Sequence, residues 1–374
     1  MRVLIVINSS WNIINFRSNL IKKIKNDGNE VFAITNKDDY SHKLENLVTE
    51  SNFVSFKSSS INPFSELKLF FHLYWKIRKI KPDIILTFTV KPNIYASIIG
   101  KILNINTVNN VAGLGIAHSN IFLRNTLKLL YKFSLSNSYK CFFQNENDLE
   151  YFLKNKIVDD SLTSLLPGSG VDIEYFNMND EQESSKKLKS EFNFLLSSRL
   201  LWSKGIHEYV KAARLIKKEF KNVKFWLIGF SNVDNKDSID SSRIEKWSTN
   251  GDIIFKGSTD NIKFFLKDVH SFILPSYYPE GTPKSLLEAA SMKLPIITTN
   301  TPGCKNVVID NVTGYLCQPK NHQDLYEKMK KILLLSHEER KLMGEQARKH
   351  IIKNYDDNIV NDAYISTIRF SINK

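Results

Sequence analysis

Two carboxylates around an expected helix start are the residues of this chain best suited to do chemistry. Glu280 and Glu288 have seven residues between them, in a segment that follows an apolar run and opens a helical pattern. Thr282 is expected to be the N-cap and Pro283 the first helical residue. Free N–H groups and the positive end of the helix dipole favour a diphosphate there. The residues expected to bind it are Gly281, Thr282, Pro283 and Lys284.

The two acids can take different roles at such a site. One carboxylate can face a transferred sugar, while the other accepts hydrogen bonds from ribose hydroxyls. The alternative interpretation makes both acids solvated charges on a surface helix. The spacing alone does not decide between the two.

A pair of cations in an earlier loop could complete the site. Arg199 and Lys204 lie between an expected strand and an expected helix, and Gly205 follows them. Long cationic side chains in such a loop can hold phosphate oxygens and stabilise a departing nucleoside diphosphate. The alternative is a pair of ordinary surface cations.

Alternating strands and helices position these residues. Continuous apolar runs predict buried parallel strands, and helical spacing between them predicts βαβ units. In the first half the expected strands are 3–7, 31–34, 83–87, 106–109 and 141–144, and the expected helices are 12–25, 65–79, 94–103 and 123–139. In the second half the expected strands are 193–197, 224–228, 253–255, 271–274 and 296–298, and the expected helices are 206–219, 261–267 and 285–292.

The pattern predicts two α/β domains, each a doubly wound sheet, facing a cleft that holds the ligand. A polar, aperiodic stretch around 177–189 separates them. We expect domains at 1–176 and 190–355, and a C-terminal helix, 356–374, that packs back on the first domain.

Charge and cysteine content narrow the class of protein. The net charge is +13 over 374 residues, which favours anionic partners such as phosphorylated ligands, anionic lipid or nucleic acid. The three cysteines, without a Cys-x-x-Cys pair, argue against a disulfide framework or a zinc site. No stretch approaches the ~18 uncharged apolar residues that span a bilayer.

Together these motifs resemble glycosyltransferase family 4. The family's second-domain pattern is matched by Arg199…Lys204-Gly205, Glu280…Glu288, Pro302-Gly303-Cys304 and Asn311…Gly314. In the first half, Lys91…Tyr95 and Val111…Gly115 are similar to a subgroup of bacterial transferases. That subgroup adds sugars, often N-acetylgalactosamine, to undecaprenyl-diphosphate-linked acceptors of capsule, O-antigen or N-glycan synthesis.

The resemblance implies a GT-B fold, retention of anomeric configuration, a UDP-sugar donor, and no cofactor or essential metal. It implies that Arg199 and Lys204 bind the donor diphosphate, Glu288 the ribose, and Glu280 the sugar near its reacting face. No Asp-x-Asp triplet is present, which agrees with metal independence. Departures from the pattern are the glycine-free turn at Asn8-Ser9-Ser10-Trp11, Lys293, Asn300, and a His118 without an assigned role.

The basic first half offers two interpretations. The segment 65–81 combines Phe70, Phe71, Tyr74 and Trp75 with five Lys or Arg residues, which suits an anionic membrane surface. The alternative is an ordinary helix whose aromatics face the sheet. On the first interpretation the protein is cytoplasmic and peripheral on the inner face of the cell membrane.

The sequence thus predicts a retaining transferase that moves a hexose or N-acetylhexosamine from a UDP-sugar to a lipid-diphosphate-linked saccharide. Three alternatives are a nucleotide-sugar epimerase of the same architecture, a basic nucleic-acid-binding protein, and an inactive family member. Against nucleic acid as a partner, the chain shows no helix-turn-helix, zinc-finger or RNA-binding signature.

Overall fold

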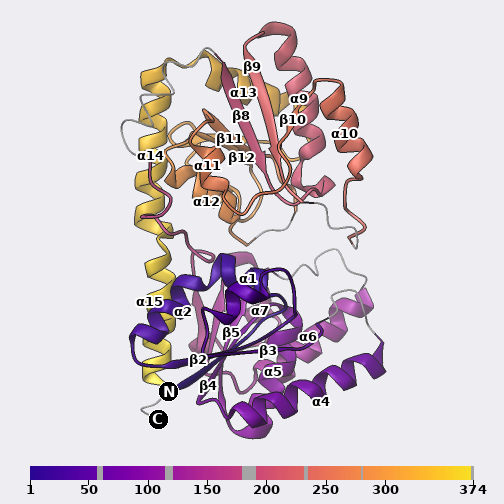
Figure 1. Ribbon diagram of the computed structural model, residues 1–374, viewed down its shortest axis with the longest axis vertical. Helices are drawn as coiled ribbons and strands as arrows, with labels where there is room; N and C mark the ends of the chain where they lie inside the picture. The colour runs from indigo at the N-terminus through magenta and orange to yellow at the C-terminus, as the bar shows by residue number, and fades with distance from the viewer. Residues whose placement is uncertain (57–61, 114–120, 179–190, 231–234, 279–280, 372–374) are drawn as a thin grey trace. The chain divides into compact units, whose positions relative to one another are not determined.

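The computed structural model describes residues 1–56, 62–113, 121–178, 191–230, 235–278 and 281–371. It forms two compact units, one from Met1–Ser169 with Asp357–Lys374 and the other from Gly170–Asp356 (Figure 1). The second unit therefore begins earlier in the chain than the expected residue 190. Phe176 and Met178 are buried in its hydrophobic core, and the Val171 amide donates to the Tyr355 carbonyl at 2.9 Å.

The described part of the first unit contains a seven-stranded parallel sheet with the order β3-β2-β1-β4-β5-β6-β7. Its strands are β1 (Arg2–Val6), β2 (Glu30–Thr35), β3 (Glu50–Phe53), β4 (Ile84–Phe88), β5 (Asn106–Val111), β6 (Lys140–Phe143) and β7 (Thr163–Leu165). Its helices are α1 (Ser10–Phe16), α2 (Ser18–Asn26), α3 (Ser41–Glu45), α4 (Pro63–Ile80), α5 (Val90–Leu103), α6 (Ile121–Leu135), α7 (Glu146–Lys154) and α15 (Asp357–Phe370).

Both faces of this sheet are covered, which explains the continuous apolar runs of strands such as β1 and β4. In β1, Val3 and Ile5 join the core under α1, α2 and α15, while Leu4 and Val6 join the core under α4 and α5. The helix α15 lies beside α2 (Figure 1), so the last segment of the chain completes the first core.

The helix expected at 12–25 is two helices. The chain breaks at Arg17, whose backbone angles are φ −133° and ψ 2°. The glycine-free turn that precedes α1 supplies the cap of this helix. The Ser9 hydroxyl accepts the Asn12 amide at 3.2 Å.

The second unit repeats the scheme with a parallel sheet of order β10-β9-β8-β11-β12-β13. Its strands are β8 (Phe192–Ser197), β9 (Val223–Ile228), β10 (Ile254–Phe255), β11 (Ser271–Leu274), β12 (Ile296–Thr299) and β13 (Gly314–Cys317). Its helices are α9 (Ile206–Glu219), α10 (Ser241–Thr249), α11 (Ile262–Leu266), α12 (Lys284–Ser291), α13 (His322–Leu334) and α14 (His337–Tyr355).

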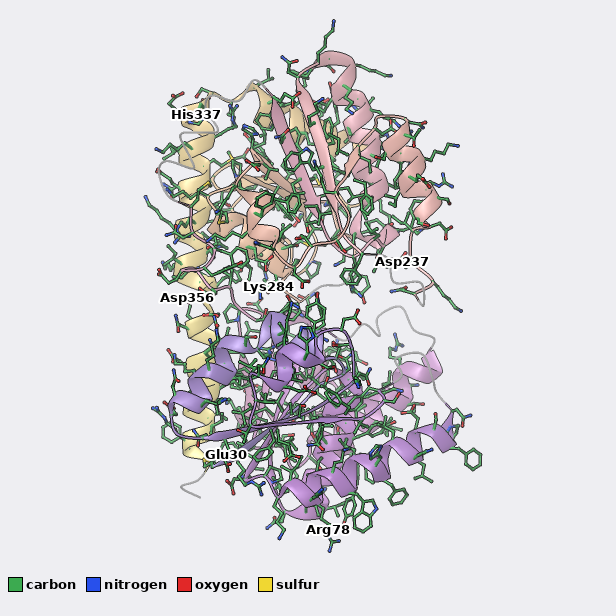
Figure 2. All side chains as sticks on the ribbon, viewed as in Figure 1. Glu30, Arg78, Asp237, Lys284, His337 and Asp356 are labelled. Atoms are coloured by element: carbon green, nitrogen blue, oxygen red, sulfur yellow. The ribbon has the colours of Figure 1, made fainter. Side chains whose placement is uncertain are left out.

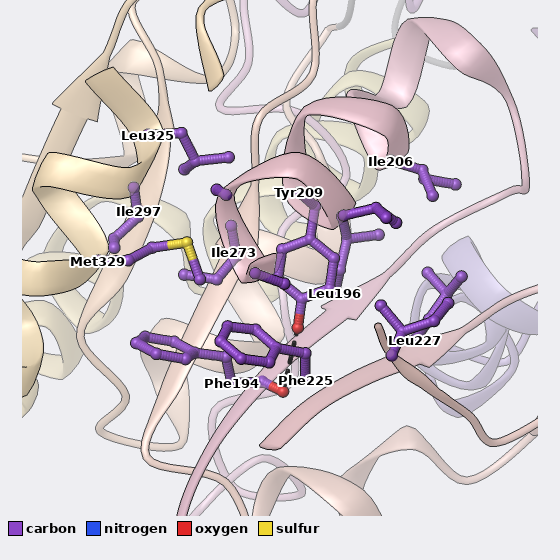
Figure 3. Packing of buried hydrophobic residues seen from close by; sticks show 14 of the residues in the cluster. Phe194, Leu196, Ile206, Tyr209, Phe225, Leu227, Ile273, Ile297, Leu325 and Met329 are labelled. Carbon is purple, nitrogen blue, oxygen red and sulfur yellow. Dashed lines mark hydrogen bonds between the residues drawn. The ribbon is translucent and has the colours of Figure 1, made fainter. Parts of the chain in front are cut away.

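Aromatic packing fixes α9 on the second sheet. Tyr209 is fully buried and packs edge-on against Phe225, whose ring stacks on Phe194 (Figure 3). The Tyr209 hydroxyl donates to the Phe194 carbonyl oxygen at 3.2 Å. Burying a hydroxyl that has such a hydrogen-bond partner costs little free energy of folding. The Tyr209 ring can therefore anchor α9, the helix that follows the Lys204 loop.

Both units have the doubly wound, Rossmann-like topology that the sequence predicts. The strand order reverses between β1 and β4 in the first unit and between β8 and β11 in the second. Ligands of such sheets bind outside the carboxyl ends of the strands at this reversal. None of the helices in the described residues is long and apolar enough to cross a membrane.

Candidate functional site

The expected donor residues lie at the reversal point of the second sheet. Arg199 and Lys204 follow β8, and the segment from Pro275 to Lys284 follows β11. These two strands are parallel neighbours, with Phe272 paired to Leu195. Their carboxyl ends therefore meet at one edge, and residues far apart in the sequence reach the same site.

An aromatic ring brings the two cations together. The Arg199 guanidinium carbon lies 5.6 Å from the centroid of the Tyr278 ring, and the Lys204 ammonium nitrogen lies 5.2 Å from it. Lys204 is only 6% exposed. Two cations within reach of one ring form a concentrated positive field, which suits a diphosphate. Sequence reasoning missed Tyr278, although the Tyr277-Tyr278 pair just before Glu280 was a usable signal.

The turn that carries Lys204 is held against the β11 loop. The Ser203 carbonyl accepts the amides of Tyr277 at 2.8 Å and Tyr278 at 3.1 Å. Gly205 has φ 73°, and a Cβ there would lie 2.1 Å from the Pro275 carbonyl oxygen. Only glycine satisfies both the backbone angle and the close approach.

A second missed residue fixes the other side of this turn. Asp237 accepts the Ser203 amide at 3.1 Å and also the Ser203 hydroxyl, while its own carbonyl accepts the Trp202 amide at 2.9 Å. Asp237 therefore positions the backbone that presents Lys204. Asp237 belongs to no recognisable motif, and it lies far from Ser203 in the sequence.

The start of α12 differs by one residue from the expectation. Pro283 is the N-cap, with φ −65° and ψ 113°, and the helix begins at Lys284 (labelled in Figure 2). The expected N-cap Thr282 precedes the cap, because the fixed φ of proline also suits the extended cap position. No side chain caps this helix. The N–H groups of its first turn can therefore donate to an anion.

Glu288 lies one turn after Lys284 on α12. Burial raises the pKa of Glu288 to about 7, and the Lys284 charge opposes that rise. Among the described residues, none forms a hydrogen bond or ion pair with its carboxyl group. A half-buried acid that lacks such a partner is a group that a hydroxyl-bearing ligand would satisfy. Glu280 and His118 lie outside the described residues.

The chain matches two family models. The one described as Glycosyl transferases group 1 matches residues 177–350, and the one described as Glycosyl transferase 4-like matches residues 2–145. The first match contains the Arg199 loop and α12, where the sequence places the expected donor residues.

The chain is similar to bacterial glycosyltransferases over most or all of its length. The N,N'-diacetylbacillosaminyl-diphospho-undecaprenol alpha-1,3-N-acetylgalactosaminyltransferase of Campylobacter jejuni is 28% identical and covers 98% of this chain and 97% of that relative. The UDP-Gal:alpha-D-GlcNAc-diphosphoundecaprenol alpha-1,3-galactosyltransferase of Escherichia coli is 27% identical over 71% of this chain and 70% of its own. The structure of Anabaena Alr3699/HepE with UDP and glucose has a TM-score of 0.81, 16% identity, and 99% coverage of both chains.

Proposed function

This chain is a glycosyltransferase of the GT-B fold, and we propose that it transfers a sugar from a UDP-sugar to an undecaprenyl-diphosphate-linked saccharide in glycan biosynthesis. The observation that carries the donor half of the proposal is the pairing of Arg199 and Lys204 over Tyr278 at the sheet reversal. The acceptor half is supported by the named substrates of the two relatives, which share a diphosphoundecaprenol.

In this proposal the second unit binds the donor. Arg199, Lys204 and the first N–H groups of α12 hold the diphosphate, and Glu288 accepts hydrogen bonds from the ribose hydroxyls. Glu280 contacts the transferred sugar, which we propose to be N-acetylgalactosamine or a similar hexose. The Campylobacter relative, which transfers N-acetylgalactosamine by its name, supports that choice of sugar.

We propose that the transfer retains the anomeric configuration and needs no metal. An acceptor hydroxyl attacks the anomeric carbon from the face that the diphosphate leaves, and a diphosphate oxygen takes the hydroxyl proton. Arg199 and Lys204 stabilise the negative charge that develops on the leaving group. No covalent enzyme nucleophile is required, and excess EDTA should leave the rate unchanged.

A UDP-release assay tests the proposed reaction. Wild type is incubated with each of several UDP-sugars, with and without a lipid-diphosphate sugar as acceptor, beside Glu280→Ala and Lys204→Ala. We expect acceptor-dependent UDP release from one donor, lost in both variants. Turnover of a nucleotide sugar without acceptor would instead support an epimerase, and failure to bind UDP would refute the donor site.

A stripe on α4 supports a peripheral membrane location. The exposed fractions of Phe64, Leu67, Phe71 and Trp75 are 85%, 56%, 52% and 61%, at spacings that place them on one helical face. Phe70 and Tyr74 pack instead against the sheet, so each of the two sequence interpretations fits part of this helix. The cations Lys68, Arg78 and Lys79 are exposed as well (Arg78 is labelled in Figure 2).

We therefore propose that this face of α4 contacts the anionic inner leaflet, where a lipid-linked acceptor resides. In a sedimentation assay with phosphatidylglycerol-containing liposomes, Phe71→Ser with Trp75→Ser should reduce binding at least about tenfold. Phe264→Ser, which changes a 61% exposed aromatic of α11, is the matched control. Charge reversal of Lys76, Arg78 and Lys79 should weaken binding too, and unchanged binding in both sets would refute the proposal.

A further inference from the structure

Arg17 in the first unit is a buried cation without an opposite charge. Arg17 is only 4% exposed, and its Nε atom is buried without a hydrogen-bond partner in the described part of the chain. Among the described residues, none accepts a hydrogen bond from its side chain or pairs with its charge. Burial lowers the pKa of Arg17, against a smaller opposing effect of Tyr364.

The surroundings of Arg17 are aromatic. Its guanidinium carbon lies 4.3 Å from the centroid of the Phe88 ring and 5.8 Å from that of Tyr364. The Tyr364 hydroxyl accepts the Asn110 side-chain amide at 2.9 Å, so it is already engaged. Ring faces attract a cation but do not replace the hydrogen bonds that five N–H donors need. An anion would supply them.

The position of Arg17 fits a ligand. It follows β1 and stacks on Phe88, the last residue of β4, and the order of the first sheet reverses between these two strands. Arg17 is thus at the carboxyl-end edge where doubly wound sheets bind ligands. It also forms the break between α1 and α2, which the helical pattern of the sequence did not predict.

The junction between β4 and α5 gives a second, independent indication of a ligand site. Thr89 has φ 71° and ψ 163°, a combination that is costly for a β-branched residue, and its Oγ1 atom is buried without a partner. Backbone strain of this kind persists where the surroundings hold it, often at ligand sites. No side chain caps α5, which begins at the next residue.

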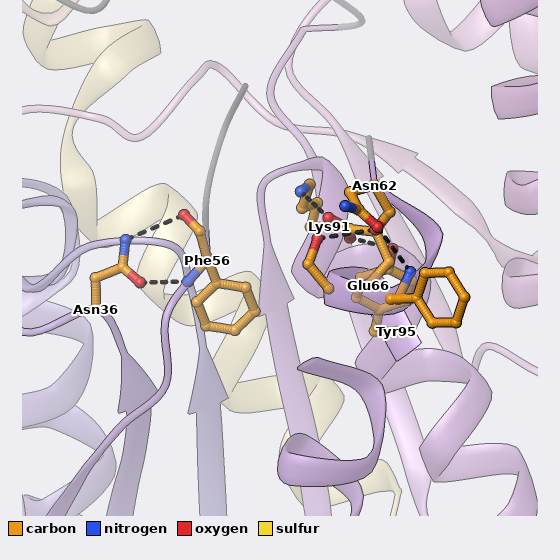
Figure 4. A network of polar contacts seen from close by, with 8 residues as sticks. Asn36, Phe56, Asn62, Glu66, Lys91 and Tyr95 are labelled. Carbon is orange, nitrogen blue, oxygen red and sulfur yellow. Dashed lines mark hydrogen bonds and ion pairs between the residues drawn. The ribbon is translucent and has the colours of Figure 1, made fainter. Parts of the chain in front are cut away.

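The nearby cation Lys91 is already occupied. Its ammonium lies 2.7 Å from a carboxylate oxygen of Glu66, whose other oxygen accepts the Tyr95 hydroxyl (Figure 4). This network ties α5 to α4 and neutralises Lys91. Arg17 is therefore the better candidate for an anionic ligand.

We propose that Arg17, together with the β4–α5 junction at Thr89, binds a phosphate group of the acceptor diphosphate. This inference rests on the proposed function for its acceptor, while the phosphate site itself rests on the first unit alone. A guanidinium is suited to the task because it donates two parallel hydrogen bonds to one phosphate.

The test compares Arg17→Met with wild type and with Arg2→Met. Arg2 also lies over a ring, that of Phe32 at 4.6 Å, but its side chain is 37% exposed near the amino end of β1. Calorimetric titration of the full chain uses three probes: inorganic pyrophosphate, a short-chain prenyl-diphosphate N-acetylhexosamine, and UDP. Thermal unfolding without ligand is measured in parallel.

We expect Arg17→Met to weaken binding of the prenyl-diphosphate sugar at least about tenfold, with UDP binding and the Arg2→Met control unchanged. Without ligand its Tm should equal or exceed that of wild type, because an unpaired buried charge is replaced by an apolar chain. A lower Tm with weaker UDP binding would show a structural role and overturn the proposal.

Two further outcomes separate this inference from the proposed function. If pyrophosphate binding is lost in Arg17→Met but wild type never binds the prenyl-diphosphate sugar, the phosphate site stands and the proposed acceptor fails. If Arg17→Met does not fold, Arg17→Lys keeps the charge and loses the paired donors. Acceptor binding by Arg17→Lys equal to wild type would then overturn the role of the guanidinium.

Discussion

At the scale of one residue, the burial of Lys204 is what the proposed anion site must explain. A lysine this deeply buried is stable only if its charge is compensated, and the Tyr278 ring supplies part of that compensation. In the proposal, a bound diphosphate adds to that compensation. The proposal therefore assigns Lys204 and Arg199 to donor binding and to the departure of the leaving group.

Replacing Lys204 with alanine should weaken UDP binding by about 10- to 100-fold, because a charge-assisted hydrogen bond contributes about 1.5–3 kcal/mol. Titration calorimetry of the purified variant measures this loss. Lys218→Ala, which removes an exposed cation of α9, is the control and should bind UDP as wild type does. Equal affinity of Lys204→Ala and Lys218→Ala would remove Lys204 from the site.

At the same scale, the raised pKa of Glu288 leads to a prediction about how the stability of the fold depends on pH. Its pKa of about 7 in the fold exceeds the ordinary value of 4.5, so the native state binds the proton more tightly than the unfolded state. The stability that this contributes is complete below about pH 4.5 and is lost as the pH rises through about 7. Glu288→Gln, which cannot ionise, lacks this dependence.

Urea unfolding of the ligand-free proteins at pH 5 and pH 8 checks the prediction. Between these values wild type should lose up to about 3 kcal/mol relative to Glu288→Gln. Parallel pH profiles of the two proteins would mean that the Glu288 carboxyl is better solvated than its position on α12 implies.

At the scale of elements, the close approach of two loops builds the proposed donor site. The turn before α9 and the segment after β11 touch at Gly205 and Pro275, and Ser203 links them by backbone hydrogen bonds. The carboxyl ends of β8 and β11 bring the two loops together. The site therefore depends on strand pairing as much as on its ligand-binding side chains.

Gly205→Ala should destabilise the second unit by about 2–4 kcal/mol, because it adds a clash to an unfavourable backbone angle. Gly251→Ala is the matched control, since Gly251 has φ 72° and its Cβ would meet nothing within 4 Å. The control should lose only about 1 kcal/mol. Unfolding and UDP titration measure both effects, and similar losses in the two variants would contradict the close-approach argument.

At the scale of the whole molecule, the chain returns to its first unit at the end. Residues of α15, among them Tyr364 and Ile368, are buried in the core that α1 and α2 cover. The first unit is therefore assembled from both ends of the chain, while the second is continuous from Gly170 to Asp356. Contacts that close such a long loop form only in the complete chain.

Removal of residues 357–374 should unfold the first unit at a lower temperature and leave UDP binding by the second unit measurable. The expected loss exceeds about 5 kcal/mol, because several fully buried apolar side chains leave the core. Scanning calorimetry with and without UDP separates the two units. Ile359→Ser, at a 42% exposed position of α15, should leave both transitions in place.

Local patterns determined much of this protein. Apolar runs such as 3–7 and helical spacing such as 206–219 depend on neighbours in the chain, so they predict strands, helices and the doubly wound class. Glu280, Glu288, Arg199 and Lys204 are predicted site residues on the same basis, as short motifs at expected strand ends, and their roles stay predictions. Small local predictions were wrong: the N-cap of α12 is Pro283 instead of Thr282, and the helix expected at 12–25 breaks at Arg17.

Contacts between distant residues were decided only by the tertiary structure. Tyr278 joins Arg199 and Lys204, and Asp237 supports their loop, because parallel strands bring separate loops to one edge. The burial of Arg17 depends in the same way on β4 and α15. Neither charge pairing nor exposure is a property of a residue type or of its spacing. Both follow from which segments pack together, and that is settled by the free energy of the whole fold.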